Sequence, residues 1–298
     1  MYEIAVVGGS YAGLSAALQI ARARRRVAVI DGGRRRNRFA RASHGFLGQD
    51  GRDPGLIAAE AKAQLLRYPT VSWFDATVLD AGREAGGDFH LRLDDGPTIM
   101  ARRLVLATGI KDVLPDLPGL AERWGDTVFH CPYCHGYELG GVPAGVLAAS
   151  RLSLHHALML PDWGPTTLFL NGVFEPDAEE TAALAARKVA VERTPVVRLS
   201  GAEGVDAELA DGRSIRLAGL AIMPRIRPSS PVAEQLGCTL EEGPAGPFVR
   251  TDDSKETSIP GVFACGDVAR PMGNVALSVG DGAIAGARAH FSLLRAPA

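Results

Sequence analysis

The chain has 298 residues, 46% of them hydrophobic and 22% charged, and a net charge of −2. This is long enough for two domains, but it gives no electrostatic reason to expect nucleic acid or a membrane as a partner, and no stretch approaches the ~20 uninterrupted apolar residues of a membrane helix. Four cysteines are too few for a secreted disulfide framework, and the apolar N-terminal run lacks a cleavage site, so we expect a cytoplasmic protein.

The chain opens with the pattern of a dinucleotide-binding βαβ unit. A buried strand over residues 2–7 runs into a glycine turn at Gly8, Ser10 and Gly13, a helix with an apolar stripe follows, and a second strand ends in Asp31. Such a turn aims a helix N-terminus at a pyrophosphate, and the acid accepts the ribose hydroxyls. Ser10 stands where the motif has its second glycine, but serine is small enough for the backbone to approach a phosphate.

Nine arginines fall between Arg22 and Arg41. We interpret most of them as a solvated helix end and loop, with Arg34 or Arg35 as the candidates to face an adenylate just after the ribose-binding acid. The cluster lacks the interleaved aromatic residues of a nucleic-acid surface. A glycine-rich loop over 43–51 follows, and loops of this kind carry function more often than they serve as scaffolding.

The remaining elements indicate two α/β units, one inserted in the other. A strand that ends at Thr108 closes the first run of elements, the strand–helix pattern then restarts, and Rossmann-like elements return after residue 245. We therefore predict an α/β fold of two Rossmann-like domains: a discontinuous domain of residues 1–112 and 245–298, and an inserted domain of residues 113–244. Expected helices lie over 54–66, 152–160, 179–188 and 275–293, and expected strands over 71–78, 89–93, 98–100, 103–107, 145–148, 167–170, 196–199, 215–217 and 219–223.

The clearest chemical signal is the pair Cys131 and Cys134, separated by Pro132 and Tyr133. Cysteines at this spacing can close a small disulfide ring, and the arrangement lowers a cysteine pKa below its free value of ~8.5. His130 and His135 bracket the motif, so a proton donor or acceptor sits on each side of the sulfurs. The stretch therefore predicts a redox-active disulfide.

The same spacing could supply half of a zinc site, but a closed site needs two more ligands at similar spacing. The only other cysteines, Cys238 and Cys265, stand alone between apolar or glycine neighbours. We expect both to be packed core residues and favour redox chemistry, with no metal ion.

Four ordered motifs resemble low-molecular-weight thioredoxin reductases: the glycine turn at Gly8, the strand end at Thr108, the cysteine pair, and the stretch from Thr257 to Asp267. The resemblance covers nearly the whole chain. It implies a homodimer in which the discontinuous domain binds FAD and the inserted, pyridine-nucleotide-type domain carries the redox pair. Cys134 would lie over the flavin, and Cys131 would exchange with substrate. The implied FAD ligands are Gly8, Ser10, Gly13, Asp31 and Asp267, with the backbone of Val275 and Ala276 facing the flavin.

Two differences from the thioredoxin reductase pattern indicate which subfamily the chain resembles. His135 replaces the acid that the family carries after its second cysteine. The nucleotide turn of the inserted domain aligns with residues 148–153, where no glycine remains, and its basic cluster aligns with residues 171–173, where no arginine remains for a 2′-phosphate. Arg151 is a candidate phosphate ligand, but a bulky side chain at a close-approach turn more often blocks than binds. Arg151 together with the pair Arg225 and Arg227 stays open as an alternative basic site. The pattern resembles the branch of gliotoxin- and holomycin-type dithiol oxidases and of thioredoxin-reductase-like proteins that do not use NADPH.

These observations predict an FAD-dependent thiol–disulfide oxidoreductase. In the oxidase direction a substrate thiolate attacks Cys131, its second thiol resolves the mixed disulfide, and Cys134 passes electrons to the flavin, with oxygen reduced to peroxide. His135 takes and returns the protons, with His130 and His44 as alternatives. The substrate is a small-molecule dithiol or a thioredoxin-like protein. Two other functions stay open: a thioredoxin reductase fed by NADPH, ferredoxin or another donor, and a non-catalytic flavoprotein whose disulfide is a redox sensor.

Overall fold

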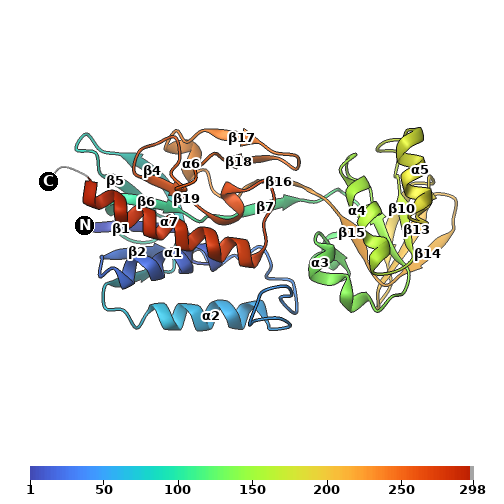
Figure 1. Ribbon diagram of the computed structural model, residues 1–298, viewed down its shortest axis with the longest axis horizontal. Coiled ribbons are helices and arrows are strands. Elements are labelled where there is room, and N and C mark those ends of the chain that lie inside the picture. Colours follow the sequence, from blue (N-terminus) through green and yellow to red (C-terminus); the bar gives the residue numbers. More distant parts are fainter. Residues whose placement is uncertain (296–298) are drawn as a thin grey trace. The chain divides into compact units, whose positions relative to one another are not determined.

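A computed structural model describes residues 1–295 and divides into two compact units (Figure 1). Unit 1 consists of Met1–Arg38, Pro54–Lys111 and the part of the chain from Ile226 onward, and unit 2 of Phe39–Asp53 and Asp112–Arg225. Both units carry parallel strands with helices between them, so the predicted α/β class is confirmed. Among the described residues, no helix combines the length and apolar character that a bilayer crossing requires.

Unit 1 is built on a seven-stranded sheet in the order β3-β2-β1-β6-β5-β4, with β19 paired to β6. The strands around β1 are parallel, whereas β4, β5 and the start of β6 are antiparallel. Successive residues of a strand point to opposite faces, and both faces are buried: Ala5 and Leu104 belong to one core cluster, Val6 and Val105 to the other. The strands are β1 (Tyr2–Val7), β2 (Val27–Ile30), β3 (Val71–Phe74), β4 (Val78–Arg83), β5 (Phe89–Leu93), β6 (Ile99–Leu106) and β19 (Val262–Ala264).

Figure 1 shows the long closing helix α7 beside α1, the helix that follows the first glycine turn. Close packing depends on small residues, because a Cβ added at Gly282 would lie 2.1 Å from the Ala12 carbonyl oxygen and one at Gly286 2.3 Å from that of Ala16. The other elements of unit 1 are α1 (Tyr11–Arg22), α2 (Pro54–Leu65), α6 (Val232–Gln235), α7 (Val275–Arg295), the 3-10 helix η4 (Gly266–Ala269), β17 (Leu240–Glu242) and β18 (Pro247–Val249).

Unit 2 has a five-stranded parallel sheet in the order β11-β10-β9-β15-β8 and a separate antiparallel meander, β12-β13-β14. Its strands are β8 (Val128–Phe129), β9 (Ala144–Leu147), β10 (Thr166–Phe169), β11 (Ala190–Glu192), β12 (Val196–Ser200), β13 (Val205–Leu209), β14 (Ser214–Leu217) and β15 (Leu220–Ile222). Its helices are α3 (Pro132–His135), α4 (Ser153–Met159) and α5 (Ala178–Ala186), with short 3-10 helices η1 (Ala121–Arg123), η2 (Tyr137–Leu139) and η3 (Leu160–Asp162). Strands β7 (Ile110–Val113) and β16 (Arg225–Pro228) pair where the chain passes between the units.

The compact units and the predicted domains do not share all bounds. Residues 226–244, which we placed in the inserted domain, pack with unit 1, because Val232, Ala233 and Cys238 join one of its core clusters. Residues 39–53, which we placed in the first domain, pack with unit 2. The predicted domain bounds follow strand patterns in the sequence, whereas the compact units follow packing contacts.

Three strand predictions also differ from the structure. The expected strand over 71–78 is two strands, β3 and β4, because the Thr77 amide donates to the Asp94 carboxylate at 2.8 Å instead of continuing the ladder. The expected strands over 98–100 and 103–107 are one strand, β6, whose first part pairs with β5 and whose remainder pairs with β1.

Candidate active site

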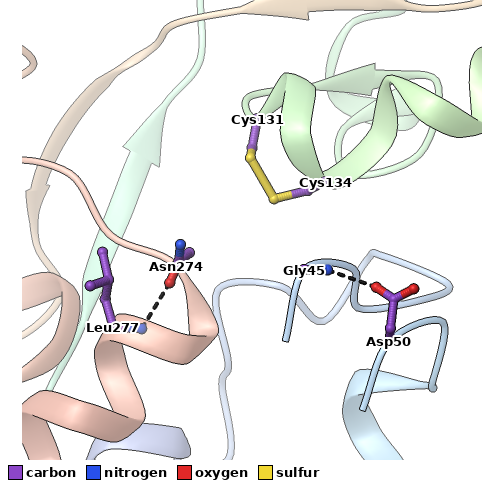
Figure 2. Close-up of a disulfide and its surroundings, with 6 residues drawn as sticks. All are labelled: Gly45, Asp50, Cys131, Cys134, Asn274 and Leu277. Atoms are coloured by element: carbon purple, nitrogen blue, oxygen red, sulfur yellow. Dashed lines mark hydrogen bonds between the residues drawn. A yellow bond between two sulfur atoms is a disulfide. The ribbon is translucent and has the colours of Figure 1, made fainter. Parts of the chain in front are cut away.

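Cys131 and Cys134 form a disulfide at the start of α3 (Figure 2). Cys131 is the N-cap residue, Pro132 begins the helix, and the two Cα atoms are 5.3 Å apart. Proline suits the first helical position because its missing amide hydrogen would have no partner there. The Cys134 amide donates to the Cys131 carbonyl at 3.1 Å, which closes the turn around the ring. The predicted disulfide is therefore present, with both cysteines half-buried.

His135, the predicted acid/base, lies in the same helix and stacks flat on Phe129, with ring centroids 4.9 Å apart and planes 7° apart. Burial lowers its pKa, while backbone hydrogen bonds to Cys131 and Gly125 and the charge of Glu138 act in the opposite direction. Its Nδ1 atom is buried without a hydrogen-bond partner. A neutral imidazole beside the cysteine turn is equipped to accept a proton.

The alternative residue His44 is brought to the redox motif by the loop of residues 39–53. Its Nε2 atom lies 3.4 Å from Oε1 of Glu138, in η2, and its Nδ1 atom lies 3.6 Å from Oδ1 of Asp50. The Gly45 amide donates to the same Asp50 oxygen at 2.8 Å, as Figure 2 shows. Glu138 was not predicted to belong to the site; the signal for it in the sequence is its position three residues after His135 on a helical stretch.

His130, the second alternative, lies against His156, a residue that was not predicted to belong to the site. Its ring centroid is 5.6 Å from that of His156, on α4. His156 is only 3% exposed, and burial, together with His130 and His155, lowers its pKa to about 3. The His155–His156 pair within an otherwise apolar helix was the sequence signal. His156 is therefore a neutral imidazole inside unit 2, next to His130, which directly precedes Cys131.

In unit 1, the first glycine turn forms an open cradle. Gly8 has a φ of 106°, and a Cβ added there would lie 2.2 Å from the Ala107 carbonyl oxygen; one added at Gly13 would lie 1.8 Å from the Gly8 oxygen. Ser10 is the N-cap of α1, but its side chain makes no capping hydrogen bond, and the first helical turn contains no acid. The amides of this turn have no partner inside the helix, which suits a phosphate group.

Two polar atoms in the segment that follows Asp31 are left without partners. The Nε atom of Arg35 and the Oδ1 atom of Asn37 are buried with no hydrogen bond, whereas Arg34 is exposed. Asp31 accepts a hydrogen bond from the Gly9 amide at 3.1 Å and keeps its second oxygen at the end of β2. Buried polar atoms without partners are costly, so these residues fit the polar adenosine diphosphate half of FAD.

The second group of predicted FAD residues lies close to the first glycine turn, because a Cβ added at Gly266 would lie 2.8 Å from Cβ of Ala12. Asp267 is in η4, and its Oδ2 atom is 3.3 Å from Nη1 of Arg36. Val275 and Ala276 form the first turn of the 21-residue helix α7, preceded by Asn274, whose Oδ1 atom accepts from the Leu277 amide at 2.8 Å (Figure 2). Their own amides have no acceptor within the helix and are available to a flavin.

The corresponding turn of unit 2 is closed by its own side chains. The Ala149 amide donates to the Ser153 hydroxyl at 3.1 Å, and the Leu152 amide donates to the Ser150 hydroxyl at 3.3 Å. Arg151, the candidate phosphate ligand, instead donates to Glu180 at 2.6 Å and to Asp177 at 3.3 Å.

The residues of unit 2 that align with the basic site, 171–173, also form hydrogen bonds within the unit. The side-chain oxygen of Asn171 accepts from the Val196 amide at 2.9 Å, and Gly172 follows it in the left-handed region. Neither residue carries a charge that could meet a 2′-phosphate. The two predicted departures from the nucleotide-binding pattern therefore coincide with a self-contained set of hydrogen bonds.

Over residues 2–282 the chain matches the family model described as pyridine nucleotide-disulphide oxidoreductase. It is 35% identical to thioredoxin reductase tcpT of Claviceps purpurea, over 97% of this chain and 93% of the fungal protein. It is 32% identical to thioredoxin reductase sirT of Leptosphaeria maculans, over 99% of this chain and 95% of that protein.

Two solved structures share the fold closely. The oxidoreductase from Agrobacterium tumefaciens superimposes with a TM-score of 0.95 at 56% identity, covering 98% of both chains. The structure of HlmI superimposes with a TM-score of 0.92 at 37% identity, covering 98% of this chain and 92% of the other.

Proposed function

Because the chain belongs to the pyridine nucleotide-disulphide oxidoreductase family, as a thioredoxin-reductase-like, FAD-dependent disulfide oxidoreductase, we propose that it is a dithiol oxidase that does not depend on NADPH. The predicted resemblance, enzyme class and cofactor are confirmed by this membership. The direction of electron flow and the role of each residue are our proposal. The observation that carries it is the closed nucleotide turn of unit 2.

That turn disfavours a pyridine nucleotide for two reasons. A pyrophosphate needs free backbone amides, and the Ala149 and Leu152 amides already donate to serine hydroxyls. NADPH also carries a 2′-phosphate that needs a cation, and Arg151 is held by the carboxylates of Asp177 and Glu180. Each missing charged hydrogen bond costs ~1.5–3 kcal/mol, so several together lower NADPH affinity by orders of magnitude.

The Cys131–Cys134 disulfide would accept electrons from the substrate directly. A substrate thiolate attacks the Cys131 sulfur, the ring disulfide breaks, and Cys134 leaves as a thiolate. The second substrate thiol loses its proton and attacks the substrate sulfur bound to Cys131, so that the substrate disulfide forms and Cys131 is released as a thiolate. The substrate thereby loses two electrons and two protons. Bound FAD supplies the two-electron acceptor that returns the cysteine pair to its oxidised form.

His135 would accept the proton from the substrate thiol, because burial keeps its imidazole neutral next to the cysteine turn. Glu138 and His44 lie close enough to influence this charge, since both alter the pKa of His135. The assignments of Cys131 as the exchanging sulfur and Cys134 as the sulfur nearer the flavin follow the family resemblance.

Anaerobic mixing tests the proposal. Millimolar NADPH or NADH should leave the flavin oxidised for minutes, whereas dithiothreitol, a small dithiol, should bleach it. In air, each equivalent of dithiol oxidised should then consume oxygen and yield peroxide. Rapid bleaching by micromolar NADPH would contradict the proposal and favour a thioredoxin reductase, and a single turnover without further peroxide would favour a redox sensor.

The proposal includes the substrate, the oligomeric state and the cellular compartment of the enzyme. The expected substrate is a small-molecule dithiol or a thioredoxin-like protein, and the expected assembly is a homodimer in the cytoplasm. The family resemblance supports the dimer, and the few cysteines, with Cys238 and Cys265 free and buried, support a reducing compartment. Light scattering of the FAD-bound protein tests the dimer, because a monomer at micromolar concentration would contradict it.

A further inference from the structure

An ion cluster in unit 1, built around one buried carboxylate, contains none of the predicted site residues. The Asp281 side chain, on α7, is 1% exposed. Arg270 donates to it from both Nε and Nη2, the latter at 2.8 Å, and Nζ of Lys255 lies 2.9 Å from the same carboxylate. The two cations outweigh burial and hold the Asp281 pKa below its ordinary value. The cluster Lys255–Arg270–Asp281 therefore carries an excess positive charge.

Stability is a weak explanation for this cluster. Taking charges out of water is unfavourable, and apolar residues of the same volume often serve a fold equally well. Lys255 is also one of the few non-glycine residues with a left-handed backbone, at φ 63°. Strain of this kind is unfavourable and clusters at functional sites. The cost is more readily explained by a role in the nearby cofactor site.

The Arg270–Asp281 pair closes the segment that joins the two halves of the predicted flavin site. Arg270 directly follows η4, which contains Asp267, and Asp281 lies within α7, whose first turn contains Val275 and Ala276. The loop between them also packs tightly, because a Cβ added at Gly273 would lie 2.4 Å from Oδ1 of Asp267.

Lys255 reaches the same carboxylate from a third segment. Its carbonyl oxygen accepts from the Ala264 amide at 2.9 Å, so the residue is fixed beside β19, the strand that leads into η4. Three separate segments that surround the predicted flavin residues thus meet at one carboxylate.

We propose that the Arg270–Asp281 pair positions Asp267 and the first turn of α7 for FAD, and that Lys255 supplies an unbalanced positive charge that favours the reduced flavin. This rests on the FAD site proposed above. Arg270 and Asp281 are positioning residues, since they act through Asp267 and the helix amides. The pair and the extra charge have separate consequences, so different substitutions distinguish them.

Arg270→Met removes the two hydrogen bonds from Arg270 to Asp281 and leaves Lys255 as the partner of Asp281. We expect the FAD dissociation constant, measured by flavin fluorescence on reconstitution, to rise about tenfold or more, since a charged hydrogen bond is lost. Arg270→Lys keeps the charge but loses the two-point contact, and should weaken FAD in the same direction. The second variant keeps the test decisive where the first does not fold.

Lys255→Met leaves the Arg270–Asp281 pair intact but neutral. This variant should keep FAD and show a lower flavin midpoint potential in a dye-coupled titration, because a nearby positive charge no longer stabilises the added electrons. Arg67→Met, which removes one exposed charge from the same unit, is the matched control and should leave both quantities unchanged.

Wild-type FAD affinity in both Arg270 variants, or an unchanged potential in Lys255→Met, would overturn the inference. Neither result would touch the proposed dithiol oxidase activity, which the NADPH experiment tests on the wild-type enzyme. Conversely, bleaching by NADPH would remove the proposed activity and leave these binding and potential measurements valid.

Discussion

The turn between β1 and α1 and the turn between β9 and α4 occupy equivalent places in two Rossmann-like units, yet one is open and the other is closed. In unit 1 the Ser10 side chain makes no capping bond, and α1 runs for 12 residues behind the turn. In unit 2 Ser153 and Ser150 take up the amides, and α4 has only seven residues. Two turns of the same architecture therefore differ in whether serine hydroxyls accept hydrogen bonds from their backbone amides.

Our proposal therefore assigns the chemistry of unit 2 to its cysteine turn and gives its nucleotide turn no role in turnover. The arrangement can be tested from both sides. Changes at the cysteine turn should abolish activity, changes at the open turn should release FAD, and changes at the closed turn should alter neither.

The largest effect is expected at the sulfurs. Cys131→Ser and Cys134→Ser should each abolish steady dithiol oxidation, because one sulfur cannot reform the ring. Cys131→Ser should also give a long-wavelength absorption band from the Cys134 thiolate beside the flavin, whereas Cys134→Ser should not. Cys238→Ser, a change at a buried cysteine outside the site, is the control and should keep turnover. The band in the opposite variant would mean that the two roles are reversed.

Substitution of His135 should have the next largest effect. General acid–base groups contribute about 10²–10⁴-fold, so His135→Ala should lose turnover on that scale while it retains FAD. Burial lowers the His135 pKa, so the neutral, proton-accepting form persists to lower pH than in a free imidazole, and turnover should fall only as pH drops through that lowered pKa.

The pH profile of dithiol oxidation checks the His135 assignment. Its acidic limb should disappear in His135→Ala. Near-normal turnover with an unchanged profile would transfer the role to His44 or His130.

The sequence predicted what depends on local spacing. The cysteine turn, the glycine cradle ending in Asp31, and the loss of glycine near Arg151 were all readable because each is set by residues close together in the chain. Contacts between residues far apart in the chain could not be predicted. Glu138 meets His44, and His156 meets His130, through tertiary packing that leaves no periodic signal.

The same limit explains the domain bounds. Segment 39–53 was assigned to the first domain because it is flanked by that domain in sequence. In the structure Arg41 pairs with Asp126 at 3.0 Å, and a Cβ added at Gly125 would meet the Phe39 side chain. Such contacts exist only once both segments are folded, so a pattern-based boundary could not include them.

A matched pair of substitutions compares the two turns directly. Asp31→Ala, at the open turn, should raise the FAD dissociation constant about tenfold or more, because ribose hydroxyls lose a charged acceptor. Arg151→Ala, at the closed turn, should leave FAD affinity and dithiol turnover unchanged. Its ion pairs are half-exposed, and exposed pairs contribute ~0–1 kcal/mol. Reconstitution titrations check both, and a loss of turnover in Arg151→Ala would contradict the division of roles.

The smallest effect concerns the helices behind the two turns. The buried face of α1 is apolar, whereas α4 buries His156, whose pKa falls from 6.5 to about 3. A folded-state pKa below the unfolded value means that the unfolded chain binds a proton that the folded chain refuses. The contribution of His156 to the free energy of unfolding is therefore fully present above about pH 6.5 and is lost progressively as pH falls toward about 3. His156→Gln removes this proton uptake.

The thermal midpoint of His156→Gln should consequently change less between about pH 7 and about pH 5 than that of the wild type, a window in which few carboxylates titrate. His155→Gln, at the exposed neighbour, is the control and should retain the wild-type dependence. An equal pH dependence in all three proteins would mean that His156 is protonated in the folded state. The interior of unit 2 would then hold a charge next to His130, and the proton balance at Cys131 would have to include it.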